Sequence, residues 1–153
     1  MNLRFKAILV GGLVGGTFDI AYATIFSNLR SGVPPTRILQ SVAAGLLGTK
    51  AFEGGTATAA LGLALHFAMV LIIAAIYVSA VRSMDVLVRR PLLYGTVYGL
   101  VVYAVMNAVV LPLSNLPPRS SAPPLILVTT GLLVHVFGVG VPIAFAARKY
   151  MTK

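Results

Sequence analysis

Four long apolar runs dominate the pattern of the chain, at residues 7–27, 56–81, 92–113 and 124–147. At about 1.5 Å rise per residue, a helix of ~20 apolar residues crosses the ~30 Å hydrocarbon core of a bilayer. Backbone in lipid must satisfy its own hydrogen bonds, and the alternation typical of a membrane β-barrel is absent. We therefore predict an all-α integral membrane protein with four transmembrane helices in a single transmembrane domain, residues 1–153.

The composition and net charge of the chain indicate which partners to expect. The chain is 58% hydrophobic and only 10% charged, so a soluble domain could not bury its apolar side chains. The net charge of +9 would suggest nucleic acid in a soluble protein. Here the basic residues flank the apolar runs, so we expect a lipid bilayer with anionic lipids as the partner and no nucleic acid. The chain has no cysteine, which excludes disulfides and thiolate chemistry.

The basic residues also predict an orientation. Four crossings place the N-terminus, the 82–91 loop and the C-terminus on one side, with eight of the 12 basic residues. Because cytoplasmic loops are enriched in Lys and Arg, both termini are expected in the cytoplasm. The eight are Arg4, Lys6, Arg82, Arg89, Arg90, Arg148, Lys149 and Lys153, against Arg30, Arg37, Lys50 and Arg119 on the other side.

The first run imitates a signal peptide, with basic residues before it and Ala21-Tyr22-Ala23 as a small-x-small site. Asp19 interrupts the apolar core of such a signal, and the run continues through Ile25-Phe26. We interpret it as a retained transmembrane helix.

The sequence also contains an internal repeat of two helical hairpins. A shift of 83 residues pairs Gly12 with Gly95 and Gly16 with Gly99, and it pairs Pro34-Pro35 with Pro117-Pro118. A shift of 69 pairs Gly62 with Gly131 and His66 with His135. The two shifts differ by an insertion at about 36–48, which we predict to be a short interfacial helix with Ile38, Leu39, Val42 and Leu46 on one face. A re-entrant segment is the alternative.

Small residues predict how the helices pack. Gly12 with Gly16, and Gly95 with Gly99, have the four-residue spacing that lets transmembrane helices approach closely. Packing within one chain is the preferred interpretation, and self-association through one of these faces is the alternative. Pro142 should kink the last helix near Gly138, because it cannot donate a hydrogen bond there. Tyrosines near the run ends, such as Tyr77 and Tyr98, are expected at the membrane interface.

Each run offers one polar group to a layer inside the membrane: Asp19, His66, Asn107 and His135. A carboxylate there costs roughly 2.5–3.5 kcal/mol on insertion scales, so it should face the bundle and find a partner. Two imidazoles beside an acid suggest a proton relay or a metal site with His66, His135 and Asp19 as candidate ligands. The alternative is a structural clamp between helices.

The two histidines are the residues that bear on a cofactor. No cofactor is expected, although the two histidines leave a b-type haem or a divalent metal open. No Ser/His/Asp or paired-carboxylate arrangement points to an enzyme.

Several motifs together resemble the YagU-like group of small bacterial inner-membrane proteins. They are the glycine-rich first run, Leu65-His66-Phe67, Gly95-x-x-x-Gly99 followed by Leu111-Pro112-Leu113-x-x-Leu116-Pro117-Pro118, and Val134-His135-Val136-Phe137-Gly138 before a basic tail. The resemblance implies a bacterial inner-membrane location and no specific activity.

Three functions remain open at this point. The leading hypothesis is a small membrane protein that moves or senses protons, a cation or a small solute, with Asp19 as the titrating group and a homo-oligomer as the expected assembly. The second is a non-transporting interaction or envelope-integrity protein. The third is a haem or metal carrier.

Overall fold

The computed structural model describes residues 2–116 and 122–152, and within them every regular element is helical. Four helices are long and apolar enough to cross a membrane: Leu3–Ser31, Gly55–Val81, Pro91–Leu113 and Leu125–Met151. Each coincides with one of the four predicted runs, so the all-α, four-helix membrane fold is confirmed. Pro117, Pro118, Arg119 and Lys153, which entered the sequence argument, lie outside the described residues.

Local sequence sets where the first helix begins and ends. α1 (Leu3–Ser31) begins after Asn2, whose side chain accepts a hydrogen bond from the backbone N–H of Arg4. It ends at Gly32, which adopts the left-handed conformation with φ of 65°. α3 (Gly55–Val81) then returns to the starting end of the molecule.

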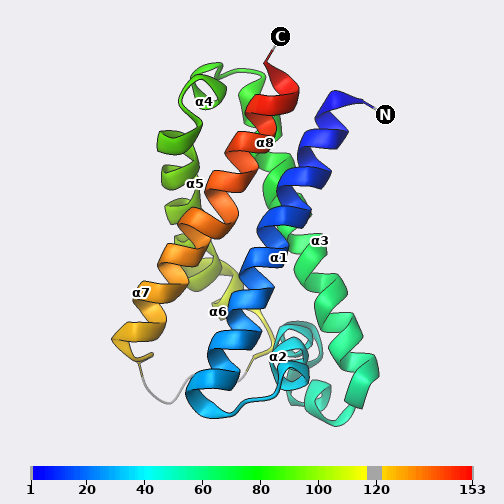
Figure 1. Cartoon of the computed structure of the whole chain (residues 1–153). Coiled ribbons are helices and arrows are strands. Elements are labelled where there is room, and N and C mark those ends of the chain that lie inside the picture. Colours follow the sequence, from blue (N-terminus) through cyan, green and yellow to red (C-terminus); the bar gives the residue numbers. More distant parts are fainter. Residues whose placement is uncertain (1, 117–121, 153) are drawn as a thin grey trace.

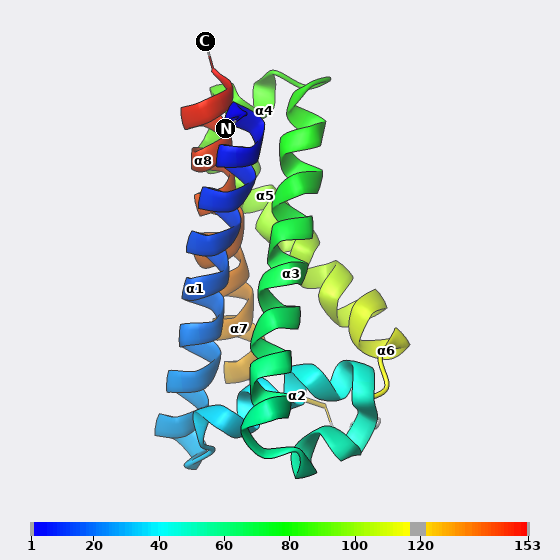
Figure 2. The same ribbon diagram turned by 90° about the vertical axis from the view of Figure 1, so that its right-hand side faces the viewer.

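The second hairpin consists of two helices with changes of pitch. α5 (Pro91–Val105) continues into η2 (Met106–Val110) and α6 (Leu111–Leu113). α7 (Leu125–Leu133) continues into η3 (Val134–Gly140) and α8 (Val141–Met151). Both termini and α4 (Val86–Arg89) lie at one end of the bundle, which we call the terminal end (Figure 1). α2 (Pro35–Leu47) lies at the other, the α2 end (Figure 2).

α2 confirms the predicted short helix, and its buried residues are not those of the predicted apolar face. Gln40, Ala43 and Ala44 are buried, whereas Leu46 is exposed. The amide of Gln40 donates to the carbonyl oxygen of Gly55 at 3.0 Å, so a polar side chain ties α2 to the start of α3. Small alanines allow the close approach of α2 to α3, which leaves the larger side chains of this helix free to meet lipid. α2 leads into η1 (Gly48–Glu53), the turn before α3.

Glycine contacts bring α1 close to two neighbours at once. A Cβ at Gly12 would lie 2.7 Å from the side chain of Leu71 on α3, and one at Gly11 would lie 3.1 Å from the Cα of Ile143 on α8. The second hairpin has the same kind of contact, because a Cβ at Gly95 on α5 would lie 2.8 Å from the Cα of Val141 on α8. Each of these glycines contacts a neighbouring helix of the same chain.

The terminal end contains an apolar core that tyrosines complete. Tyr77 is buried there, and its hydroxyl donates to the carbonyl oxygen of Leu87 at 3.1 Å. Tyr98 packs edge-on against it and donates to Ile73 at 2.7 Å. Both tyrosines therefore face into the bundle, and each hydroxyl bonds to a backbone carbonyl, which for Tyr77 lies in α4 outside the spans.

The last helix leaves α-helical geometry just before Pro142. The η3 segment is a π-helix, closed by a hydrogen bond from the N–H of Val141 to the carbonyl of Val136. It contains Gly138, whose carbonyl would have bonded the missing N–H of Pro142. η2 is also π-helical and directly precedes Leu111-Pro112. The disturbance predicted near Gly138 thus takes the form of a π-turn.

Candidate functional site

Asp19 lies between the two histidines of the chain. One carboxylate oxygen is 3.9 Å from Nδ1 of His66, and the other is 3.7 Å from Nδ1 of His135. The three residues come from α1, α3 and η3. Side-chain exposure is 21% for Asp19, 9% for His66 and 19% for His135, so the group is largely enclosed. The structure brings together three of the four predicted polar residues, and we call them the Asp19 site.

Glycines position the two imidazoles. At Gly16, one turn before Asp19, a Cβ would lie 2.8 Å from the ring of Phe67, so only glycine lets α3 approach this closely. At Gly99 on α5, a Cβ would clash with the carbonyl oxygen of His135. Each histidine therefore lies where a glycine of the neighbouring helix allows a close approach, through the imidazole for His66 and through the backbone for His135.

The hydrogen bond of His66 fixes which nitrogen carries its proton. Nε2 of His66 lies 2.9 Å from the carbonyl oxygen of Gly16. A carbonyl oxygen only accepts, so Nε2 must donate an N–H. In the neutral imidazole, Nδ1 then carries a lone pair, and this lone pair faces the carboxylate of Asp19. Two acceptors face each other unless one of them binds a proton.

His135 has the opposite arrangement. Its Nδ1 lies 2.9 Å from the carbonyl oxygen of Gly131 in the preceding turn, so Nδ1 donates there and also faces Asp19. The edge-to-face ring of Tyr103, with centroids 5.4 Å apart, supports the imidazole from α5. In neutral His135 the single Nδ1–H is donated to Gly131, so this nitrogen has no lone pair facing the carboxylate.

The carboxylate itself makes no direct hydrogen bond within the described part of the chain. Both imidazole nitrogens stand beyond the 2.7–3.2 Å usual for N–H···O bonds. The chain itself leaves a fifth of the Asp19 side chain uncovered. Among the described residues, the site therefore holds a carboxylate with no direct hydrogen-bond donor, beside the Nδ1 lone pair of His66.

Asn107 is not brought into this site. It is exposed, and its amide donates to the carbonyl oxygen of Tyr103 one turn earlier, at 2.9 Å. The predicted role of Asn107 in the layer rested on depth alone, and depth does not fix which face of a helix a residue occupies. Asn107 also falls in the η2 π-turn, where α-helical spacing no longer applies. Tyr103 is the residue of this helix that joins the site.

A second polar contact lies one turn from Asp19 toward the α2 end. The hydroxyl of Tyr22 donates to the hydroxyl of Thr130 on α7, which in turn donates to the carbonyl of Ile126. The sequence argument did not single out this pair. Tyr22 stands three residues after Asp19, a spacing that puts both on one face of α1 and could have revealed it.

The directions of the ring nitrogens limit how this site could hold a metal or a haem. A cation would find the Nδ1 lone pair of His66 and the carboxylate, but His135 would first have to release Gly131. Within the described residues, no three potential ligands lie close enough together to hold a metal ion. A haem with two axial histidines needs their free nitrogens to face each other across the ring. Here Nε2 of His66 is bonded to Gly16 and Nδ1 of His135 is bonded to Gly131, and the free Nδ1 of His66 faces Asp19.

Comparison of the chain with known proteins finds no match to a protein-family model, to a curated protein or to a solved structure.

Proposed function

We propose that this multi-pass membrane protein binds and releases a proton at the Asp19 site, and that it moves or senses protons across the bilayer. The observation that carries the proposal is the orientation of His66. Its Nε2 is committed to Gly16, so its Nδ1 lone pair faces the carboxylate. One added proton converts this repulsive contact into an ion pair. The site thus has two states that differ by one charge.

The depth of the site supports this role. Asp19 lies 12 residues before the end of α1, about 18 Å from the α2 end along the helix. Intramembrane acids in helix bundles commonly mark proton or ion pathways, because an ionised group there is costly to keep. Toward the terminal end the site meets the apolar core around Val70, Ala74 and Val139. Toward the α2 end it meets the hydroxyls of Tyr22 and Thr130. These surroundings favour proton exchange with the α2 end in this conformation.

The packing supports a duplicated origin of the two hairpins. Gly16 contacts His66 and Phe67, and Gly99 contacts His135 and Val136. The glycines are related by the shift of 83, and their contacts by the shift of 69. The same relation would have given each half one histidine, while Asp19 belongs to the first half alone. We propose that a symmetric ancestor acquired the acid and became a proton site.

A non-transporting interaction or envelope-integrity protein is the second candidate. The near-complete burial of His66 and its bond to Gly16 favour a helix clamp. The long distances from Asp19 to both imidazoles argue against it, because a clamp would be expected to use direct hydrogen bonds. A haem or metal carrier is the third candidate, and the directions of the two Nδ1 atoms argue against it.

Location and assembly follow from the charge pattern and the resemblance. Both termini lie at one end, together with the basic residues that flank them, and we propose that this end faces the cytoplasm and its anionic lipids. Similarity to the YagU-like group would place the protein in a bacterial inner membrane. A single protomer has only four membrane-spanning helices with which to surround a transport path, so we propose a homo-oligomer.

Proton flux into proteoliposomes tests the proposal. We expect Asp19→Asn to abolish dissipation of an imposed pH gradient while the protein still reconstitutes. Asp85→Asn is the matched control, because Asp85 lies in the loop beside α4 and outside the spans. Proton uptake after a pH jump, followed by the two histidine ring resonances, covers a sensor that carries no flux. Equal flux and equal uptake in Asp19→Asn and Asp85→Asn would overturn the proton function.

A further inference from the structure

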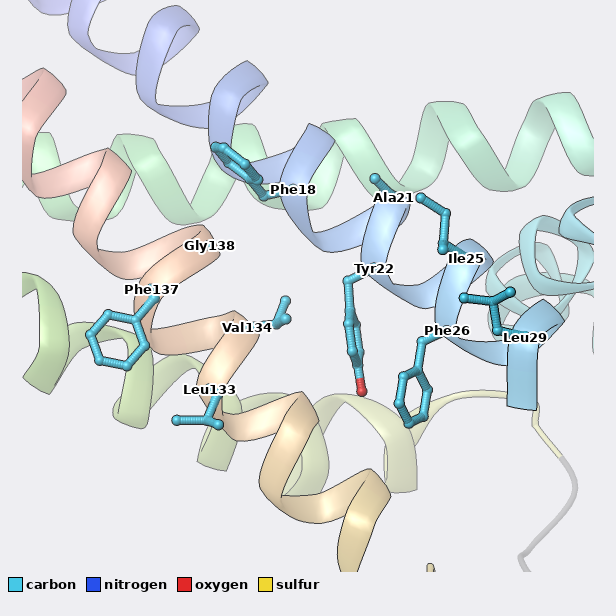
Figure 3. Close-up of a pocket in the computed structure, with 10 residues that line it drawn as sticks. All are labelled: Phe18, Ala21, Tyr22, Ile25, Phe26, Leu29, Leu133, Val134, Phe137 and Gly138. Atoms are coloured by element: carbon cyan, nitrogen blue, oxygen red, sulfur yellow. The ribbon is translucent and has the colours of Figure 1, made fainter. Parts of the chain in front are cut away.

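An apolar groove runs along the side of the bundle between α1 and the α7–η3 helix. Its volume is about 620 Å³ (Figure 3). From α1, Phe18, Tyr22 and Phe26 point into or border it, and Val134 and Phe137 border it from η3. The Tyr22 and Phe26 rings stack at 5.1 Å, which gives the groove a flat aromatic wall. The Tyr22 hydroxyl is already bonded to Thr130, so no polar group in the wall calls for a polar ligand.

The groove follows the direction in which lipid chains lie. It borders α1 from Phe18 to Leu29, which is about 16 Å along a helix that spans the membrane. Lipid chains run roughly parallel to such a helix. The groove is open at the outer side of the bundle, so in a bilayer its apolar walls face the surrounding lipid chains.

The cross-section shows what can lie wholly within the groove. A volume of 620 Å³ spread over ~16 Å gives a mean cross-section of about 40 Å². A helix about 10 Å wide has a cross-section of about 80 Å², so a helix could enter the groove only in part. A hydrocarbon chain is about 4–5 Å wide, since carbons touch at ~4 Å, so two chains fit side by side.

Charge identifies the headgroup. Arg30 follows Leu29, the last residue bordering the groove, in the last turn of α1. It is exposed, and neither of the two ion pairs found in the described residues involves it. An exposed arginine one residue beyond the lining of an apolar groove, in the last turn of a membrane-spanning helix, suits a phosphate with two parallel hydrogen bonds.

We propose that this groove is a binding site for one diacyl phospholipid with an anionic headgroup. Its chains lie between α1 and η3, and its phosphate meets Arg30. The lipid would touch the helices that carry Asp19 and His135, yet its binding does not depend on the proton function.

Retained lipid measures the site directly. We expect protein purified in mild detergent to keep phospholipid in stoichiometric amount, by phosphate analysis and mass spectrometry. Ala21→Trp fills the groove and should lower lipid affinity at least about tenfold, equivalent to ~1.4 kcal/mol. Ile76→Trp is the matched control, because Ile76 is 57% exposed on α3, away from the groove. In nanodiscs of phosphatidylcholine and phosphatidylglycerol, Arg30→Gln should remove the preference for phosphatidylglycerol and keep the chains bound.

Fluorescence provides a second readout that needs no groove-filling substitution. The chain has no tryptophan, so Phe137→Trp and Ile76→Trp each carry a single reporter. Acyl-brominated phosphatidylglycerol should quench Phe137→Trp at low mole fraction and reach saturation, whereas quenching of Ile76→Trp should rise in proportion to the brominated fraction. Proportional quenching of both, or equal retained phosphate in Ala21→Trp and Ile76→Trp, would overturn the lipid site. A drop in oligomer mass in Ala21→Trp at unchanged phosphate would assign the groove to a second copy and also overturn it.

Discussion

The imidazole of His66 donates its Nε2–H to the carbonyl oxygen of Gly16, a residue 50 positions earlier on the neighbouring helix, at 2.9 Å. This single bond fixes the tautomer of a buried histidine and turns its Nδ1 toward Asp19. The contact exists because Gly16 has no side chain. Packing and protonation chemistry therefore depend on the same glycine.

Gly16→Ala should damage both the fold and the site. The new methyl group would stand 2.8 Å from the Phe67 ring and 3.6 Å from Nε2 of His66, which forces α1 and α3 apart. We expect a loss of about 1–3 kcal/mol, as for other overpacked sites, seen as a lower Tm in detergent. Gly131→Ala is the control, because its Cβ would meet only Tyr103 at an ordinary 3.5 Å. An unchanged Tm in Gly16→Ala would show that the helices are not tightly apposed there.

Asp19→Asn should separate the proton function from folding. The asparagine amide can donate an N–H to the Nδ1 lone pair of His66, so the contact becomes favourable without an added proton. We expect the variant to remain as stable as the wild type and to lose proton uptake. Thermal unfolding and the His66 ring resonances, assigned with His135→Gln, measure the two effects. If uptake persisted in Asp19→Asn, the proton would reside on another group.

The helices and most of the site could be predicted from the sequence because both follow from the free-energy cost of exposing polar groups to lipid. Apolar runs of this length exclude other folds, and Asp19, His66 and His135 had to face inward at one depth because lipid tolerates none of them. Asn107 has a satisfied amide within its own helix and could face outward. Its side was set by a π-turn, which leaves no periodic signal in the sequence. The inward direction of Tyr77 and Tyr98 also leaves no signal in the sequence, since a tyrosine hydroxyl can be satisfied at the membrane surface or by a backbone carbonyl.

Tyr77→Phe should weaken the terminal end. The hydroxyl of Tyr77 is the partner of the Leu87 carbonyl in α4, and its removal leaves that buried acceptor unpaired. We expect a loss of about 1 kcal/mol or more, measured as a lower Tm, with proton uptake unchanged. Tyr94→Phe is the control, because Tyr94 makes no side-chain hydrogen bond within the described residues. Equal Tm values for the two variants would mean that water replaces the Tyr77 hydroxyl.

Pro142→Ala should change the geometry of the Asp19 site through the backbone. Proline cannot donate to Gly138, and the π-turn over Val134–Gly140 accommodates that loss while it carries His135. Alanine restores the donor, so we expect the turn to relax toward an α-helix and the protein to become more stable.

The same relaxation should rotate His135 relative to Asp19, because an α-turn holds one residue fewer than a π-turn in each hydrogen-bonded ring. The ring resonances of His135 should shift while those of His66 stay near their wild-type positions. Pro112→Ala is the matched control, since it follows the π-turn at Met106–Val110, which carries no histidine. A His135 spectrum that changed equally in both variants, or in neither, would show that proline does not set the position of this imidazole.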